Sequence, residues 1–220
     1  MVASMTGGYL VYLGIVTEHY FSPSDLPEPE DLRLLQISTR GHDLQMWVTG
    51  QVFSTTRLDP GTRELLHALP ELPTSGNILD LGCGWGPLAV VAATESPEST
   101  VWAVDVNPRA LDLTARNASA NLAPNVETLL ADVALERAAV EGIRFDAIIS
   151  NPPVRVGKAA LHDMLARWLP LLSEDGTAWL VVGKNLGADS LLRWLRQEGW
   201  DAQKFSSRKG YRIITVRRGR

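Results

Sequence analysis

The sequence predicts an α/β protein with one seven-stranded, mostly parallel β-sheet that ends in an antiparallel hairpin and follows a short N-terminal extension. From about Asn77 onward, short apolar runs alternate with longer segments of helical periodicity, which is typical of strands followed by covering helices. The last two apolar runs are joined only by Ser206 to Gly210, which is too short for a parallel crossover. With 220 residues and 45% hydrophobic content, the chain suffices for one domain with one sizeable core.

The individual elements follow from the local pattern. We expect strands at residues 77–81, 100–105, 126–130, 144–150, 177–182, 200–206 and 211–217, and helices at residues 62–69, 86–95, 108–121, 159–172 and 187–198. Asn107 can cap the third helix, and Pro108 suits its first turn.

The N-terminal part has a different pattern. Residues 32–53, interrupted by two glycines, should form a small hairpin-like extension. Residues 1–15 are expected to be a leader or extension outside the fold. Residues 16–220 then form a single domain, with residues 16–60 as its N-terminal extension.

Composition excludes several classes of function. Cys83 is the only cysteine, so an intrachain disulfide is impossible and a reducing, cytoplasmic location is favoured. The four histidines lack metal-ligand spacing, so we expect no metal. The apolar run at residues 9–16 is shorter than the roughly 20 residues of a membrane helix, so we expect no membrane partner.

The charge is unevenly distributed along the chain. The formal net charge is -4, but residues 193–220 carry +7 and the preceding residues carry -11. A basic C-terminal face could contact phosphates, or it could be a solvated surface.

A glycine-rich loop predicts a cofactor site. Residues 77–81 should be a buried strand that leads into Gly82, Cys83, Gly84, Trp85 and Gly86. The glycine spacing differs from that of the dinucleotide fingerprint, and Asp80 stands two residues before the first glycine. A carboxylate there would repel a pyrophosphate but suits a cofactor with a sulfonium and an ammonium group, as S-adenosylmethionine has. A plain glycine turn is the alternative interpretation.

Two further acids follow the next two strands. Asp105, with Val106 beside it, ends the second strand and is placed to accept hydrogen bonds from ribose hydroxyls. Asp132 follows the third strand, where an aspartate can receive the exocyclic amine of adenine. Each acid alone could be a helix cap, but the carboxyl ends of successive parallel strands line one crevice.

The fourth strand runs directly into Asn151, Pro152 and Pro153. Two prolines could simply end the strand. Alternatively, the Asn151 side-chain oxygen and the Pro152 carbonyl can accept hydrogen bonds from one amine and direct its lone pair at a methyl donor. Proline adds no competing backbone donor. The sequence therefore predicts a methyl-accepting site at these three residues.

From about Thr17 to its C-terminus, the chain resembles the small-domain family of class I, Rossmann-like methyltransferases, which includes the ribosomal RNA guanine-N2 methyltransferases. The segments that carry the resemblance are His19-Tyr20-Phe21-Ser22, Val52-Phe53-Ser54, Leu58-Asp59-Pro60-Gly61-Thr62, D-L-G-C-G-W-G from Asp80, Val104 to Ala110, and Ser150 to Lys158.

The resemblance implies S-adenosylmethionine as cofactor and ribosomal RNA or a ribosomal subunit as partner. It also implies that Phe53 and the turn from Asp59 to Thr62 fold over the cofactor. Many relatives have an aromatic residue after N-P-P, where this sequence has Val154, so base stacking must come from elsewhere, with Phe53 as one candidate. Larger relatives carry a second domain for which 220 residues leave no room.

Basic residues near these motifs are candidates for RNA contacts. Lysine and arginine can meet phosphates beside a target nucleotide. The candidates are Arg155, Lys158, Lys184, Arg208, Lys209 and Arg212.

The most favoured function is S-adenosylmethionine-dependent methylation of a guanine N2 amine in ribosomal RNA. Because N-P-P also serves other amines, a protein glutamine amide or an adenine amine is a second possibility. A non-catalytic cofactor-binding protein that interacts with RNA is a third.

Overall fold

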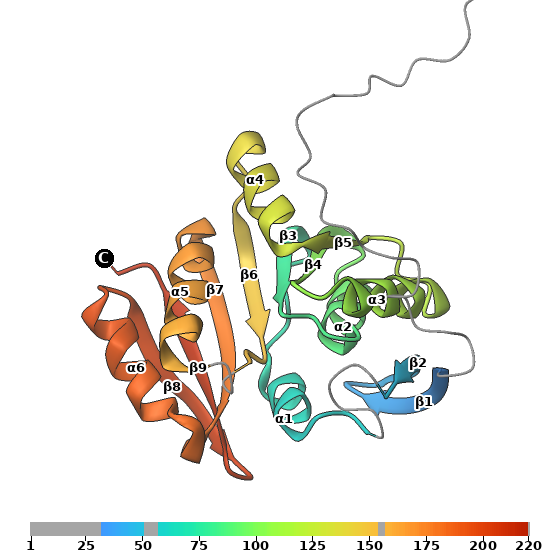
Figure 1. Ribbon diagram of the computed structural model, residues 1–220, viewed down its shortest axis with the longest axis horizontal. Coiled ribbons are helices and arrows are strands. Elements are labelled where there is room, and N and C mark those ends of the chain that lie inside the picture. The colour runs from blue at the N-terminus through green and yellow to red at the C-terminus, as the bar shows by residue number, and fades with distance from the viewer. Residues whose placement is uncertain (1–31, 51–56, 154–156, 220) are drawn as a thin grey trace, which may run out of the picture.

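The computed structural model describes residues 32–50, 57–153 and 157–219 (Figure 1). Its main sheet has the strand order β5-β4-β3-β6-β7-β9-β8, and β9 is antiparallel to both of its neighbours. The seven-stranded, mostly parallel sheet with a C-terminal antiparallel hairpin is therefore confirmed. The strands are β3 (Ser75–Leu81), β4 (Glu98–Asp105), β5 (Val126–Leu130), β6 (Phe145–Ser150), β7 (Leu172–Gly183), β8 (Asp201–Arg208) and β9 (Tyr211–Arg217).

Helices cover both faces of this sheet (Figure 1). On one face lie α1 (Pro60–Ala68), α2 (Pro87–Glu95) and α3 (Pro108–Ala120), and on the other lie α4 (Ala131–Glu141), α5 (Lys158–Trp168) and α6 (Ala188–Gln197). Because successive strand residues point to opposite faces, Ile78 belongs to the first hydrophobic core and Leu79 to the second. Among the described helices, none is both long and apolar enough to span a membrane.

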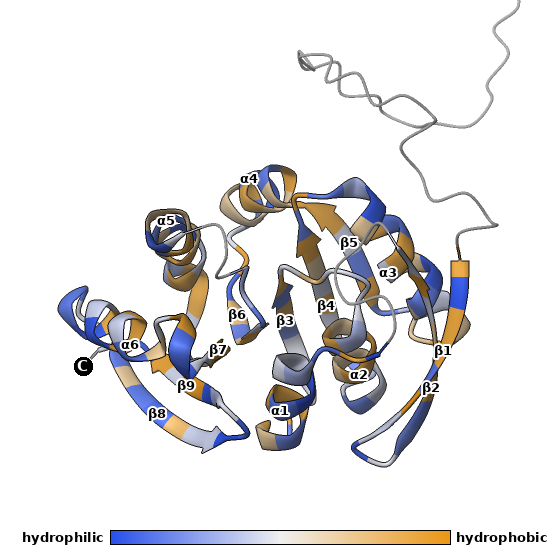
Figure 2. Cartoon of the chain, turned by 60° about the horizontal axis from the view of Figure 1, so that its bottom comes forward, coloured by the Kyte–Doolittle hydropathy of each residue, from blue (hydrophilic) through white to orange (hydrophobic). Residues whose placement is uncertain are grey.

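The β8 edge of the sheet is mostly polar, with Phe205 as its exposed large apolar side chain. β8 is the last strand and is mostly hydrophilic in Figure 2, with Ala202 as its buried residue. Exposed polar residues on an edge strand discourage pairing with another chain.

Three stretches differ clearly from the predicted elements, and one of them is β7, which begins at Leu172 instead of residue 177. Helix α4 was not predicted, because only Ala134 and Ala138 of it are buried, and two small residues give a weak periodic signal. The helix expected at 159–172 ends at Trp168 and continues as a 3-10 turn, η4 (Leu169–Leu171). Pro170 lacks the N–H that an α-helix would need there.

The N-terminal extension is a separate hairpin of β1 (Leu32–Thr39) and β2 (His42–Thr49), as predicted. Asn117 of α3 and Asn121, which follows the end of this helix, bind the hairpin backbone in the way a neighbouring strand would. The Asn117 side chain accepts a hydrogen bond from the Trp47 N–H at 2.6 Å and donates to the Trp47 carbonyl at 2.9 Å. Asn121 forms the same pair of bonds with Gln45 at 3.0 and 2.8 Å. The hairpin is thereby held against α3.

Candidate active site

The glycine loop connects β3 to α2 and is fixed by backbone hydrogen bonds. The amides of Gly82 and Cys83 donate to the Val104 carbonyl at 2.8 and 3.0 Å, which holds the loop against the end of β4. At Gly86, φ is 84° and a Cβ atom would lie 2.7 Å from Cγ2 of Thr114 on α3. Only glycine fits this position without displacing α3.

Asp80 lies beneath this loop and is fully buried. Its Oδ2 accepts a hydrogen bond from the Ala89 N–H at 2.9 Å, whereas Oδ1 has no hydrogen-bond partner among the described residues. Burial raises the pKa of this carboxyl from 3.8 to about 8. The Ala89 hydrogen bond lowers the pKa, and the nearby Asp105 charge raises it by a smaller amount. At pH 7 the Asp80 side chain is therefore mostly protonated, and it supports the start of α2 from below.

Asp105 supplies the carboxylate at the end of β4. Its Oδ2 accepts a hydrogen bond from the Gly84 N–H at 3.0 Å, and its Oδ1 accepts one from the Asn107 N–H at 2.9 Å. A carboxylate oxygen can accept two hydrogen bonds, so each oxygen retains capacity for another donor. Asp105 thus anchors the glycine loop while its remaining lone pairs stay available.

A cavity of about 770 Å³ opens at the carboxyl ends of the parallel strands. β3 has β4 on one side and β6 on the other, so the chain continues in opposite directions across the sheet from this strand. The crevice at such a switch point is a common ligand site in α/β proteins. The lining is mainly apolar. It includes Gly82, Gly84, Asp105, Val106, Ala131, Asn151, Pro152, Pro153, Met164, Leu186 and Tyr211.

Asn151 lines this cavity with its amide held in one orientation. Its Nδ2 donates to Asp59 Oδ2 at 2.7 Å and to Thr62 Oγ1 at 3.0 Å. Asp59 Oδ2 also accepts a hydrogen bond from the Thr62 N–H at 3.0 Å and so caps α1. With both NH2 hydrogens directed at acceptors, Asn151 Oδ1 stays an acceptor and binds no donor among the described residues. The arrangement can receive an amine at a fixed point of the cavity.

The sequence profile of the methyltransferase small domain matches residues 43–215, which is most of the chain. The chain belongs to this methyltransferase family. It is 30% identical over 203 residues to the uncharacterized protein YbxB of Bacillus subtilis, an alignment that covers 92% of this chain and 100% of that protein.

Two other similar proteins are considerably longer than this methyltransferase. Ribosomal RNA small subunit methyltransferase C of Shewanella piezotolerans is 39% identical over 140 residues, which cover 61% of this chain and 39% of that protein. The structure of the T. thermophilus 16S rRNA N2 methyltransferase RsmC, in complex with AdoMet and guanosine, superposes with a TM-score of 0.73 at 26% identity. That match covers 87% of this chain and 52% of RsmC.

The residues predicted for the cofactor and methyl-accepting sites occupy different positions relative to the cavity. Gly82, Cys83, Gly84, Trp85, Asp105, Val106, Asn151 and Thr62 line it, whereas Asp80 and Gly86 are not among its lining residues. Trp85 is only 4% exposed and packs into the first hydrophobic core, so most of its side chain contributes to packing. Phe53 lies outside the described residues.

Asp132 is also absent from the cavity lining. It sits in the first turn of α4, its side chain is 87% exposed, and its Oδ1 accepts a hydrogen bond from Arg167 at 2.8 Å. Its neighbour Ala131 reaches the cavity instead. A contact between Asp132 and adenine stays a prediction.

Tyr211 lines the cavity although no sequence motif indicated it, and Asp59, expected only to fold over the cofactor, holds the Asn151 amide. Tyr211, at the start of β9, approaches Gly61 so closely that a Cβ there would lie 3.1 Å from the tyrosine ring and 3.4 Å from Asn151 Nδ2. Asp59 and Tyr211 lie far from Asn151 in the sequence. The D-P-G-T segment was the only signal for Asp59, and nothing in the sequence indicated Tyr211.

The predicted RNA-binding residues are partly engaged by acids. Arg208 and Lys209 approach Glu64 at 3.7 and 3.2 Å, although their own side chains are 61% and 60% exposed. Arg212 pairs with Asp189. Lys158 begins α5 and Lys184 begins the 3-10 turn η5 (Lys184–Leu186), while Arg155 lies outside the described residues. Their role in RNA binding stays a prediction. In the described part of the chain, no three His, Cys, Asp or Glu residues gather in a way that could hold a metal ion.

Proposed function

We propose that this methyltransferase uses S-adenosylmethionine to methylate the exocyclic N2 amine of a guanine in ribosomal RNA. The observation that carries the proposal is the fixed Asn151 amide. Its NH2 group is occupied by Asp59 and Thr62, and the residue lines the same cavity as the glycine loop. Two relatives support the choice of acceptor, because both are named as ribosomal RNA methyltransferases and one was solved with guanosine.

The residues at the ends of β3 and β4 fit the cofactor. Asp105 has unused lone pairs for the two ribose hydroxyls, and the 81% exposed side chain of Val106 offers an apolar surface beside the adenine. Gly82 and Gly84 bring backbone to the cavity wall without side chains in the way. When bound, S-adenosylmethionine supplies a methyl group on an electrophilic sulfonium.

The N-P-P segment can orient the target amine, which is a weak nucleophile. The lone pair of a guanine N2 is delocalised into the ring, so the site must favour a geometry in which that pair faces the methyl group. Asn151 Oδ1 and the Pro152 carbonyl can accept the two N–H bonds of the amine and hold it in that orientation. Asp59 and Thr62 keep the Asn151 oxygen available by occupying its NH2 group. The nitrogen becomes acidic on alkylation and loses its proton afterwards, so no strong base is required.

Tyr211 can provide the aromatic contact that Val154 lacks. A base inside a stacked helix cannot reach a recessed amine site, so the target guanine must leave its stack. The Tyr211 ring lines the same cavity as Asn151, and a base held by Asn151 would have this ring within reach. Stacking on an aromatic side chain contributes about 1–3 kcal/mol per base.

Labelled S-adenosylmethionine separates the possible acceptors. The protein is incubated with ribosomal subunits, with naked ribosomal RNA and with total cellular protein, and Asn151→Ala serves as the control in each case. We expect label in N2-methylguanosine after digestion of the RNA. Label in protein glutamine or in methyladenosine would replace guanine as the acceptor, and no transfer to any fraction would favour a non-catalytic RNA-interacting protein.

A further inference from the structure

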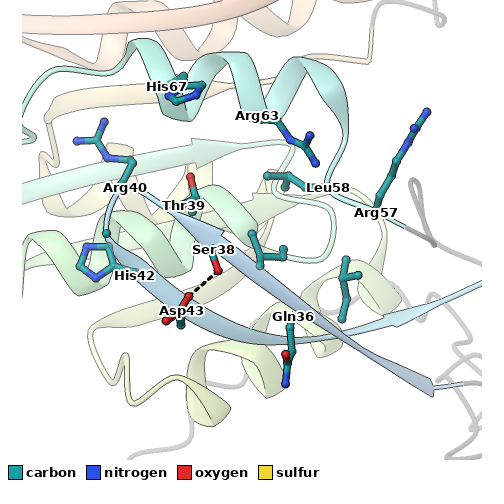
Figure 3. A pocket seen from close by; sticks show the side chains of 13 residues that line it. Gln36, Ser38, Thr39, Arg40, His42, Asp43, Arg57, Leu58, Arg63 and His67 are labelled. Atoms are coloured by element: carbon teal, nitrogen blue, oxygen red, sulfur yellow. Dashed lines mark hydrogen bonds between the residues drawn. The ribbon is translucent and has the colours of Figure 1, made fainter.

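A second groove, of about 700 Å³, lies between the β1–β2 hairpin and α1. Figure 3 shows Arg40, Arg57 and Arg63 around it, with His67 on α1 and His42 on the hairpin. Asp43 is the one acidic residue among those that line it. The Asp43 carboxylate accepts a hydrogen bond from Ser38 Oγ at 2.5 Å. The lining therefore carries more basic than acidic side chains, although Glu95, next to the groove, pairs with Arg40 and lies 3.5 Å from His42.

One wall of the groove is rigidly built. Arg40 donates to both carboxylate oxygens of Glu95 at 2.6 and 2.8 Å and to the carbonyls of Leu66 and Leu69 at 2.9 and 2.7 Å. These bonds tie the hairpin turn to the C-terminal ends of α1 and α2. Arg40 thus shapes the groove, and its guanidinium is already occupied.

Arg63 and His67 present their side chains on one face of α1. They stand four residues apart, which places them one above the other on the helix. Both residues are exposed, and the Arg63 side chain has no hydrogen-bond or ion-pair partner in the part of the chain that the structure describes. By contrast, Arg208 and Lys209 share the nearly buried carboxylate of Glu64. For an anion, Arg63 in the groove is therefore a better binding partner than Arg208 at the β8–β9 turn, because Arg208 is already close to Glu64.

Helix α1 connects the groove to the methyl-accepting site. Its N-terminal residues Asp59 and Thr62 hold Asn151, and the next residue, Arg63, lines the groove. In both Figure 1 and Figure 2, α1 lies between the β8–β9 hairpin and the β1–β2 hairpin. A strand whose base enters the cavity would leave it along this helix.

We propose that this groove binds the backbone phosphates of the single-stranded RNA that flanks the target nucleotide, with Arg63 and His67 as the main contacts. The inference rests on the proposed function, since RNA is the expected substrate. Guanidinium groups bind phosphate oxygens through two parallel hydrogen bonds, and such contacts position a nucleic acid without reading its sequence. The groove would set the direction in which the RNA strand crosses α1.

The test is the salt dependence of RNA binding by an Arg63→Gln/His67→Gln double variant. The probe is a short fluorescein-labelled, single-stranded oligoribonucleotide that contains one guanosine, and anisotropy gives its dissociation constant over a series of KCl concentrations. Removal of one phosphate contact should reduce the slope of log K against log salt by about 0.7 for a single strand. Arg144→Gln, which removes an exposed arginine just before β6, at the end of the sheet opposite the cavity, is the matched control and should keep the native slope.

The outcomes separate the groove from the proposed function. A double variant with native affinity and slope, or a native protein that does not bind the oligoribonucleotide at low salt, overturns the groove proposal. S-adenosylmethionine affinity, measured by calorimetry, should stay native in all variants and shows that they are folded. If the slope changes as expected but native protein transfers no methyl group to RNA, the groove stands and the guanine-N2 function fails. If native protein methylates RNA while the double variant binds normally, only the groove proposal fails.

Discussion

Replacement of Asp80 by asparagine should make the stability of the protein less dependent on pH. The folded protein holds a proton on Asp80 up to a pKa of about 8, whereas the unfolded chain releases it near 3.8. Between these values unfolding releases a proton, so the stabilisation from this site is complete below pH 3.8 and is lost as pH rises towards 8. Asparagine imitates the protonated acid, because its oxygen can accept from the Ala89 N–H and it carries no charge at any pH.

The magnitude follows from the width of the window. While Asp80 is protonated only in the folded state, the free energy of unfolding falls by about 1.4 kcal/mol per pH unit. From pH 5 to pH 7, the native protein should thus lose about 3 kcal/mol relative to Asp80→Asn. Urea unfolding at several pH values gives the free energy of unfolding of the native protein and of Asp80→Asn. In the difference between them, the contributions of the titrating groups that both proteins share cancel.

A matched control and the cofactor affinity complete the experiment. Glu136→Gln makes the same carboxylate-to-amide change at an exposed position of α4 and serves as the matched control for the substitution itself. Asp80→Asn should also bind S-adenosylmethionine nearly as well as the native protein at pH 7. A constant stability difference across pH would refute the buried neutral acid, and a large loss of cofactor affinity would instead support the charge-based role expected from the sequence.

The remaining predictions concern the cavity. Asp105→Ala should weaken S-adenosylmethionine binding by about 1–3 kcal/mol in calorimetry, and an unchanged dissociation constant in a folded variant would remove Asp105 from the site. Asn151→Ala should keep cofactor affinity but lower methyl transfer roughly 100-fold or more, so wild-type turnover would contradict its amine-orienting role. Asp59→Ala should lower the free energy of unfolding in urea by about 1 kcal/mol because the cap of α1 is removed. It should also slow methyl transfer, whereas Asp59→Asn, whose side chain still accepts hydrogen bonds, should retain more activity. If both Asp59 variants turn over equally, the residue does not orient Asn151. Tyr211→Leu should raise the KM for RNA about 5-fold or more while Tyr211→Phe stays near native, and equal KM values would exclude stacking.

Sequence patterns suffice to define the strands of the sheet, most of its covering helices and the edge at which the candidate site lies. Alternating apolar runs identify strands and helices because their periods differ, and parallel strands necessarily bring their carboxyl ends together. Asp105 and Asn151 could therefore be placed at one crevice although 46 positions separate them in the chain. Local rules also sufficed for the Asn107 cap, since the Asn107 side chain accepts a hydrogen bond from the Arg109 N–H at 3.0 Å.

Folding in three dimensions sets which groups face each other and which are removed from water. Asp59 and Asn151 are 92 residues apart, so their hydrogen bond depends on the packing of α1 against the end of β6. Asp80 is mostly protonated at pH 7 because burial raises its pKa to about 8, and a sequence motif carries no information on desolvation. Similarly, Glu64 engages Arg208 and Lys209, while Arg63 on the same helix faces a groove. The sequence determines which residues carry a charge, but folding determines which of them come within a few ångströms of each other and form pairs.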